Sequence, residues 1–402
     1  MSHTQDIDIA IFGGGIAGLW LISVLRRAGY SCVLLETGTL GGGQTLLSQG
    51  IIHGGLKYAL GGALSSEAEA IAGMPDRWRQ CLQGNGEPDL RDVRVLSDTQ
   101  HLFSAGSMAS GISSFFASRM LRGRIEKLKR RDYPGALHHP DFRGRVYRLD
   151  DLVVETESLV EELARPHRDA LLKLDPSRHR LHWNEQGLKS IELGETTLQP
   201  RATVFAAGAG NEQLLEQAGQ HVALPVEGQR RPLQMVLMRH RREELRFYAH
   251  CLGASNKPRL TITTHDLPDG SLVWYLGGDL AERGVARDEA EQIRAAKQEL
   301  ADIFPWLDLA DMQFATLRVD RAEPRQKSLT KPDNAHVERH GNLLVTWPTK
   351  LTLAPDLGDR VQALLEQQGP APSGTQPELD AGLERAVPGT PWWYRMQESA
   401  NE

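Results

Sequence analysis

Cysteine is scarce in this chain. Its 402 residues include three cysteines, Cys32, Cys81 and Cys251, and no two of them form a Cys-x-x-Cys pair. An odd and widely spaced set argues against a disulfide framework and offers none of the usual metal-ligand spacings. We therefore expect no metal centre, and a reducing compartment, which is the cytoplasm.

An excess of charge of one sign is also lacking. The chain has 46 Lys and Arg against 52 Asp and Glu, a formal net charge of −6. This mildly acidic balance gives no general attraction to nucleic acid or to an anionic membrane, so we expect no nucleic-acid partner. The arginine-rich stretch at 119–131 is more typical of a solvated helix face than of a partner site.

A long uninterrupted apolar run is missing as well. The apolar stretch at 7–25, IDIAIFGGGIAGLWLISVL, contains four glycines and lacks the basic region and cleavage site of a signal peptide. We therefore expect no transmembrane segment, and peripheral contact with the inner membrane stays open. Hydrophobic residues make up 40% of the chain, enough for a sizeable core.

A glycine-rich turn does stand near the N-terminus, between two apolar strands. Residues 7–12 are typical of a short buried strand, GGGIAG follows at 13–18, a helix is expected at 16–28, and residues 31–36 form a second strand. That strand stops at Glu36, 18 residues after the last glycine. The order and spacing predict a βαβ unit that binds a dinucleotide; the alternative is a glycine-rich turn in another α/β fold.

Each residue type in this unit has a physical reason. Gly13 allows the tight turn out of the strand, Gly15 lets the backbone approach a pyrophosphate at the helix N-terminus, and Gly18 lets helix and strand pack closely. The carboxylate of Glu36 can accept hydrogen bonds from ribose hydroxyls, and it would repel a 2′-phosphate.

The rest of the chain alternates between helical and strand-like patterns. A helix is expected around 63–83, and 84–150 is mixed. Residues 151–165 are typical of an amphipathic helix, with Glu155 or Thr156 near its start. Further expected strands lie at 170–175, 180–183, 188–198, 201–205, 232–239, 259–265, 271–277 and 313–320, and further helices at 211–218 and 287–303. The segment 341–369 predicts a strand, a turn and a helix, and the Pro/Gly-rich tail after 369 is expected to be loosely ordered, apart from the anchor at 392–394.

Three nucleotide-type units thus lie at 7–36, 201–211 and 341–369, far apart in the sequence, with sheet-rich segments between them. This organisation resembles the D-amino-acid-oxidase-like superfamily of FAD-dependent oxidoreductases. The resemblance implies an α/β (α+β overall) fold with a Rossmann-like FAD-binding domain assembled from discontinuous segments and an inserted antiparallel-sheet substrate domain. We expect the FAD domain at 1–83, 151–215 and 326–369, the substrate domain at 84–150 and 216–325, and a tail at 370–402.

Within that superfamily, SQGIIHGGLKY at 48–58 and PTKLTL at 348–353 resemble stretches of the FAD-dependent glycerol-3-phosphate dehydrogenases and oxidases. Those enzymes usually have two glycines before the lysine, where this chain has Trp347-Pro348-Thr349. The resemblance implies noncovalent FAD held along Gly13, Gly15, Ile16, Ala17, Gly18, Glu36, Thr45, Ser48, Gln49, Gly50, Ala207, Gly208, Thr349, Lys350, Leu351 and Thr352.

The resemblance also implies catalytic residues. His53 would face the substrate side of the flavin as a base; the alternative is that it packs against the flavin or is structural. Arg318 and Arg321 are candidates for clamping an anionic substrate group, and strand alternation puts them on opposite faces, so one of them is expected to serve. Alignment of ATLR with the family favours Arg318, and the alternative is a structural pairing of either arginine with Asp320 or Glu323. Weaker candidates are Lys57, Tyr58 and Tyr275.

These expectations predict an FAD-dependent oxidoreductase that oxidises a small polar CH–OH substrate, of the 2-hydroxy acid or polyol phosphate type, by hydride transfer to flavin N5. Electrons would pass on to oxygen, a quinone or a carrier protein. One alternative is an amine or amino-acid oxidase with a CH–NH donor. Another is a non-catalytic flavin-containing interaction protein whose tail at 392–394 docks a partner.

Overall fold

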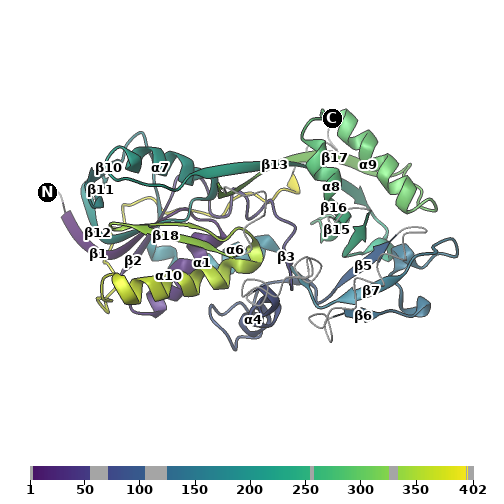
Figure 1. Ribbon diagram of the computed structural model, residues 1–402, viewed down its shortest axis with the longest axis horizontal. Helices are drawn as coiled ribbons and strands as arrows, with labels where there is room; N and C mark the ends of the chain where they lie inside the picture. Colours follow the sequence, from purple (N-terminus) through teal and green to yellow (C-terminus); the bar gives the residue numbers. More distant parts are fainter. Residues whose placement is uncertain are drawn as a thin grey trace.

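The structure, a computed structural model, describes residues 3–54, 71–104, 125–253, 258–325, 334–394 and 396. It has two lobes, and the long strands β13 (Gly228–His240) and β17 (Gln313–Pro324) run from one to the other (Figure 1). The first lobe holds both β1 (His3–Phe12) and α10 (Ala354–Gln368), which lie at opposite ends of the chain. This arrangement brings distant segments together around one site.

The sheet of the first lobe is parallel at its centre. Its strands are β1, β2 (Cys32–Glu36), β9 (Leu171–Lys173), β12 (Thr196–Phe205) and β19 (Leu343–Trp347). β1 pairs in parallel with β2 on one side and with β12 on the other, so that Phe12 lies opposite both Leu35 and Phe205. Antiparallel edges are added by β10 (Arg180–Asn184), β11 (Gly187–Leu193) and β18 (His336–His340).

Both faces of this sheet are covered. On one face, α1 (Ile16–Arg27), α6 (Thr156–Ala164) and α10 share an apolar core with α4 (Met74–Leu82). On the other face, α7 (Asn211–Gly219) packs against residues of β10, β11 and β19. Burial on both sides explains why the central strands are nearly continuous apolar runs and why the βαβ pattern could be predicted. The helix expected at 63–83 lies partly outside the described residues, which resume at 71.

The sheet of the second lobe has the order β17-β13-β16-β15-β14-β5-β7-β6. Its other members are β16 (Leu272–Gly277), β15 (Pro258–Asp266), β14 (Ala249–Leu252), β5 (Gln100–Ser104), β7 (Val146–Leu149) and β6 (Ile125–Lys127). All described pairs are antiparallel except β14 with β5. The helices α8 (Asp279–Gly284) and α9 (Glu289–Ile303) belong to this lobe, and Asp288 and Glu291 form a capping box where α9 begins.

A small third sheet joins the lobes and corrects one prediction. It contains β3 (Ile51–Ile52), β8 (Leu152–Val154) and β4 (Val95–Ser97). The helix expected within 151–165, with Glu155 or Thr156 near its start, is α6, which begins at Thr156. The first residues of that range differ from the expectation, because Leu152, Val153 and Val154 form a buried strand. Two consecutive valines pack well in a strand and lose side-chain freedom in a helix, which agrees with this outcome.

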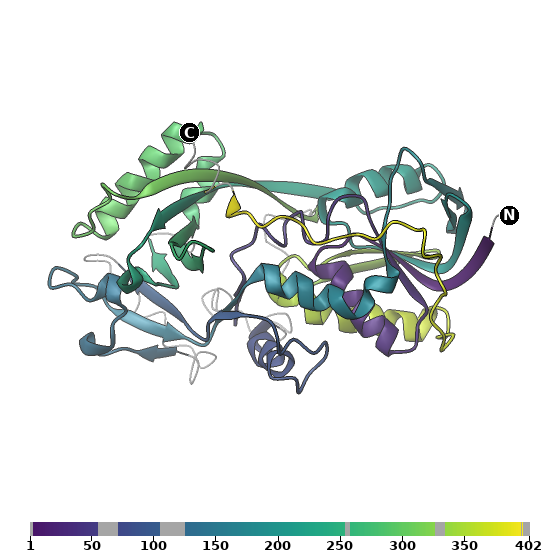
Figure 2. The ribbon, with the colours of Figure 1, turned by 180° about the vertical axis from the view of Figure 1, so that it is seen from behind.

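The described part of the C-terminal tail, residues 370–394 and 396, is a second correction, because it is not loosely ordered. Backbone hydrogen bonds join Gly374 to Gly29, Ala386 to Leu171 and Gly389 to Leu40. Figure 2 shows the yellow tail running along the first lobe towards the second, where Trp392 is 5% exposed and stacks on Tyr275 with ring centroids 4.7 Å apart. Proline and glycine predicted irregular backbone correctly, but irregular backbone that is hydrogen-bonded is ordered.

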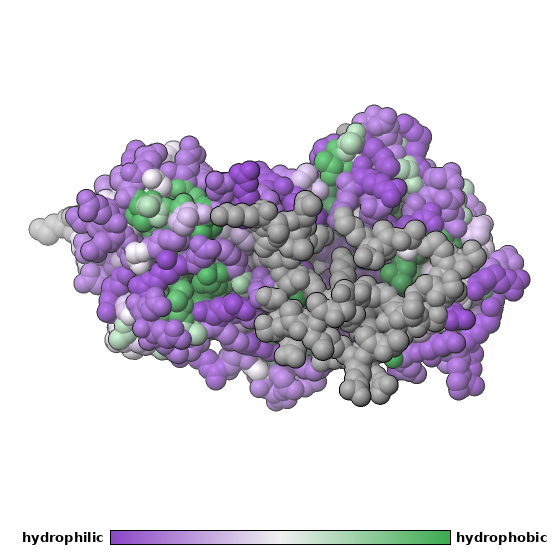
Figure 3. Space-filling view, viewed as in Figure 1, coloured by the Kyte–Doolittle hydropathy of each residue, from purple (hydrophilic) through white to green (hydrophobic). Residues whose placement is uncertain are grey.

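No helix in the described part of the chain is both long and apolar enough to cross a bilayer. The face seen in Figure 3 is mostly polar, and its apolar residues gather in small separate patches outside the grey area.

Candidate active site

A cavity of about 830 Å³ opens where β1, β2 and β12 end. In a parallel sheet the carboxyl ends of the strands meet at the edge where nucleotides bind, beside a reversal of strand order. Twelve of the residues expected to contact a cofactor line this cavity: Gly13, Gly15, Ile16, Ala17, Glu36, Thr45, Ser48, Ala207, Gly208, Thr349, Lys350 and Leu351.

The glycine-rich turn is packed so closely that side chains are excluded. Gly13 has a φ of +107°, and a Cβ placed there would lie 2.4 Å from Cα of Ala207. A Cβ on Gly18 would lie 1.9 Å from the carbonyl oxygen of Gly13. Gly18 therefore lies beneath the turn and brings the start of α1 close to β1, whereas Gly13 and Gly15 line the cavity itself.

The polar groups around the turn suit an anion and a ribose. The N-terminus of α1 faces this region, with the N–H of Ile16 donating to Oγ1 of Thr45 at 2.9 Å. At the end of β2, the carboxylate of Glu36 accepts the N–H groups of Gly14 at 2.6 Å and Gly38 at 2.5 Å. The positive end of a helix and a fixed acceptor at the strand end are the two features that a dinucleotide needs.

Three further residues expected at the cofactor do not line the cavity. The side-chain amide of Gln49 donates to the carbonyl of Tyr275 at 2.7 Å and so contacts the second lobe. Gly50 has a φ of +70° and lies so close to β8 that a Cβ would be 1.9 Å from the carbonyl oxygen of Val154. Thr352 is buried, and its hydroxyl accepts the backbone N–H of His53 at 2.8 Å.

The turn before α10 adopts a strained backbone. Thr349 has a φ of +62°, which is uncommon for a residue with a branched side chain. This is one of the positions before the lysine where the glycerol-3-phosphate dehydrogenases were expected to have glycine. Thr349 and Lys350 both line the cavity, and the helix α10 begins at Ala354 directly after them. Thr349 therefore holds a left-handed backbone conformation, which glycine adopts more readily.

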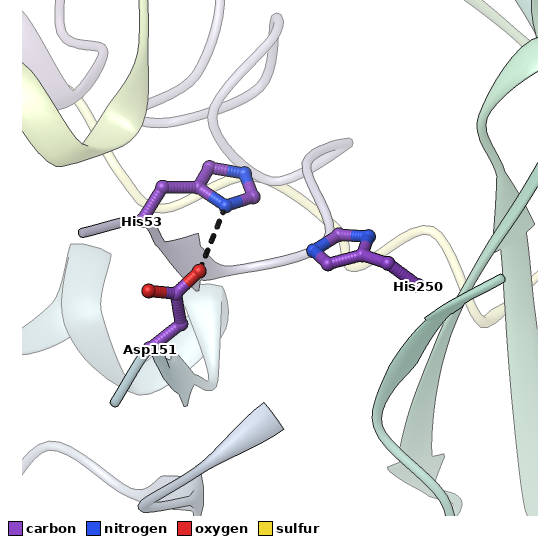
Figure 4. Close-up of side chains that lie close together, drawn as sticks. All are labelled: His53, Asp151 and His250. Carbon is purple, nitrogen blue, oxygen red and sulfur yellow. Dashed lines mark hydrogen bonds and ion pairs between the residues drawn. The ribbon is translucent and has the colours of Figure 1, made fainter. Parts of the chain in front are cut away.

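His53 lies next to this turn, in a cluster that Figure 4 shows with Asp151 and His250. Its Nδ1 is 3.4 Å from Oδ2 of Asp151, and its side chain is 40% exposed while that of Asp151 is 7% exposed. The ring of His250 stacks on that of His53, with centroids 5.6 Å apart. Sequence reasoning missed both partners. Only the pairing of β3 with β8 brings Asp151 near His53, and no local motif signals it.

The two candidate arginines lie on opposite faces of β17, as strand alternation predicts. Arg318 is exposed and donates to the carbonyl of Arg287, just before α9. Arg321 alternates with Leu317 and Val319, which pack in the core that contains Leu47 of the first lobe. Arg321 thus shares its face with the residues that pack towards Leu47, whereas Asp320 and Ala322, on the other face, line the cavity. Neither Arg318 nor Arg321 lines it.

Arg321 is held in a partly buried charged group. One guanidinium nitrogen lies 3.7 Å from Glu282, and Arg231 lies opposite it across the strands. Its Nε has no hydrogen-bond partner within the described ranges. Burial and, second, the charge of Arg231 lower the pKa of Arg321. Asp320, the alternative partner suggested by the sequence, lies near Arg230 instead.

The remaining candidates are structural or lie outside the described residues. Tyr275 is fully buried, donates its hydroxyl to the carbonyl of Leu47 at 2.7 Å, and has its pKa raised by burial. It is a core aromatic and does not line the cavity. Lys57 and Tyr58 fall outside the described ranges. All three cysteines are buried, and none lines the cavity.

Comparison with known proteins decides the family. Residues 8–345 match the DAO family, described as FAD dependent oxidoreductase. The chain belongs to this family. It is an FAD-dependent oxidoreductase with FAD as its cofactor, and the cavity fits that cofactor, with its glycine turn, helix N-terminus and acidic strand end.

A similar protein is the probable FAD-dependent oxidoreductase PA4991 of Pseudomonas aeruginosa, 51% identical over 377 residues that cover 93% of this chain and 94% of that protein. Its crystal structure superposes with a TM-score of 0.83 over 99% of this chain and 100% of that one, at 44% identity. Two distant DAO-like structures share the fold alone. Glycine oxidase of Geobacillus kaustophilus has a TM-score of 0.66 at 18% identity, covering 91% of this chain and 96% of its own. The FAD-bound L-alpha-glycerophosphate oxidase of Mycoplasma pneumoniae has a TM-score of 0.62 at 12% identity, covering 96% and 100%.

Proposed function

We propose that this DAO-family enzyme oxidises a small polar substrate at a CH–OH carbon, of the 2-hydroxy acid or polyol phosphate type, with His53 as the base. The position of His53 carries the proposal. Its backbone N–H donates to Thr352, the residue after cavity-lining Leu351, and its partly exposed ring stacks on that of His250 from the second lobe. Imidazole is the side chain that most often takes a proton in general base catalysis.

The cofactor would lie along the cavity from β1 to α10. Gly13, Gly15 and Glu36 would hold its ADP half, and Thr45 and Ser48 would follow the diphosphate. FAD supplies a hydride acceptor at flavin N5. At the other end of the cavity, the charge of Lys350 and the N-terminal end of α10 would stabilise negative charge that the flavin acquires. The burial of all three cysteines away from the cavity supports noncovalent binding.

Arg321 is the proposed clamp for an anionic substrate group. It lies on the same face of β17 as Leu317 and Val319, which pack with Leu47 of the first lobe, and its buried Nε offers a donor without a partner in the described part of the chain. A guanidinium can bind a carboxylate or a phosphate through two parallel hydrogen bonds, which would fix the substrate carbon near the flavin.

Anaerobic bleaching of the visible flavin absorbance by a substrate panel tests the proposal. The panel would contain 2-hydroxy acids, polyol phosphates, and amines including amino acids. We expect bleaching by a CH–OH compound, and a rate at least about 10²-fold lower in His53→Asn. Bleaching by amines alone would contradict the proposal and indicate an amine oxidase. That alternative is consistent with the fold shared with glycine oxidase. An unchanged rate in the variant would make His53 structural.

The same sample identifies the electron acceptor. After reduction, the flavin is exposed in turn to oxygen, a quinone and a carrier protein, and the fastest return of absorbance marks the acceptor. The non-catalytic alternative required a free tail at 392–394 to dock a partner, and the burial of Trp392 between Tyr275 and His265 argues against that role.

A further inference from the structure

We infer that Asp151 is the positioning residue for His53. It would hold the imidazole with its proton on Nδ1, so that the lone pair of Nε2 is available to the substrate. The inference rests on the proposed role of His53 as base. It concerns a residue for which the sequence offers no motif, and it follows from three features of the fold.

The first feature is strand register. β3 pairs with β8 in antiparallel fashion, with Ile51 opposite Val153 and Ile52 opposite Leu152. The next pair along the same register is His53 opposite Asp151, although 98 residues separate them in the sequence. Ile51 and Val153 also pack against Tyr248 in a small apolar cluster. Side chains two residues apart on a strand point to the same face. His53 follows Ile51 by two residues and His250 follows Tyr248 by two, so both histidines lie to one side of that cluster.

The second feature is the fixed orientation of the carboxylate. Oδ1 of Asp151 accepts the backbone N–H of Gly54 at 2.7 Å, and this bond leaves Oδ2 turned to Nδ1 of His53 at 3.4 Å. The carboxylate is almost fully buried, and a buried anion is stable only when hydrogen-bond donors or positive charge compensate it. A proton on Nδ1 supplies that donor, and the neutral ring then carries its lone pair on Nε2.

The third feature is the neighbouring ring of His250 from the second lobe. His250 is 7% exposed, its Nδ1 lies 3.1 Å from Oγ1 of Thr261, and its plane is tilted by only 28° from that of His53. Two stacked imidazoles at this separation repel each other when both are charged.

The proton and the electron pair of the reaction take separate routes. Bound FAD would take the electron pair of the substrate C–H bond as hydride, and the proton of the O–H would pass to Nε2 of His53. The Nδ1 proton stays in its hydrogen bond, so the ring becomes a cation beside the Asp151 anion. The exposed side of the ring later releases the proton to water. Asp151 thus orients the base and stabilises its charged form without itself taking a proton.

The test reads the tautomer directly and needs no substrate. ¹⁵N spectra of the FAD-loaded enzyme with ring-labelled histidine are recorded at a pH where the His53 ring is neutral, and its signals are assigned by their loss in His53→Gln. We expect protonated Nδ1 and unprotonated Nε2. In Asp151→Asn the amide N–H₂ would face Nδ1, so the ring proton should move to Nε2. Asp150→Asn is the matched control, because Asp150 pairs with Arg79 at the surface, and it should leave the tautomer unchanged.

Kinetics separate this inference from the proposed function. With the substrate found in the panel, Asp151→Asn should slow flavin reduction by about 10²-fold at little change in KM, since the misplaced proton blocks Nε2. An unchanged tautomer in Asp151→Asn would overturn the inference even if His53→Asn abolishes reduction. In the reverse result, the tautomer shifts as expected, but neither Asp151→Asn nor His53→Asn changes the rate of flavin reduction. Asp151 would then position a ring that is not the base.

Discussion

Replacing Gly13 by alanine should both destabilise the protein and weaken its binding of FAD. A Cβ at this position would lie 2.4 Å from Cα of Ala207 and 2.7 Å from the carbonyl oxygen of Ala206, and both are backbone atoms. Relief to an ordinary contact of about 3.4 Å requires β1 and β12 to separate by about 1 Å at the cavity. Overpacking of this kind costs about 1–3 kcal/mol. The φ of +107° adds about 1–2 kcal/mol of backbone strain for a residue with a Cβ.

The lower flexibility of alanine in the unfolded chain offsets about 0.4–1 kcal/mol, which leaves a net loss of about 2–4 kcal/mol. Urea unfolding of the apoprotein measures that loss, and FAD titration measures affinity, which should fall at least about tenfold. Gly219→Ala is the control, because a Cβ at the end of α7 would meet nothing within 4 Å. If Gly13→Ala binds FAD and unfolds like the wild type, β1 and β12 do not approach each other this closely.

Three further outcomes are expected. Trp392→Ala should lower the unfolding free energy by about 3 kcal/mol and weaken FAD binding, whereas the 45% exposed Tyr394 should tolerate alanine within about 0.5 kcal/mol in the same urea titration. Burial lowers the pKa of His265 to about 3. Between about pH 6.5 and pH 3, therefore, His265 is protonated in the unfolded chain but not in the folded one. Stability should therefore fall by up to about 1.4 kcal/mol per pH unit between these values, and His265→Gln should reduce that slope. Arg321→Gln should raise the KM for an anionic substrate at least about tenfold, and Arg318→Gln should leave it unchanged; the opposite pattern would restore Arg318 as the clamp.

The cofactor end of the site could be predicted because its signals are local. One βαβ unit contains the strand, the turn from Gly13 to Gly18 and the acid at Glu36. Each feature that a dinucleotide needs is supplied by a particular residue type at a fixed spacing along the sequence. The same holds for the antiparallel strands of the second lobe, whose apolar patterns have a period of two.

The catalytic end could not be predicted in the same way, because register and long-range pairing decide it. Asp151 meets His53 only through the pairing of β3 with β8. Strand alternation separates Arg318 from Arg321, but only long-range packing shows what each face meets. Leu317 and Val319 pack with Leu47, whereas Asp320 and Ala322 line the cavity. The tail was misjudged for a related reason: its composition predicts irregular backbone, and its order comes from partners far away in the sequence, such as Leu40.

The structure of the enzyme with FAD and a bound substrate analogue would test the central claim most directly. A substrate carbon must lie about 3–3.5 Å from flavin N5 and its hydroxyl about 3 Å from the base. We therefore predict Nε2 of His53 within about 7 Å of N5, on the side where the analogue lies, with Nδ1 bonded to Asp151. A flavin ring on the far side of the Thr349–Leu351 turn from His53, or a ring of His53 turned away from the analogue, would contradict this claim.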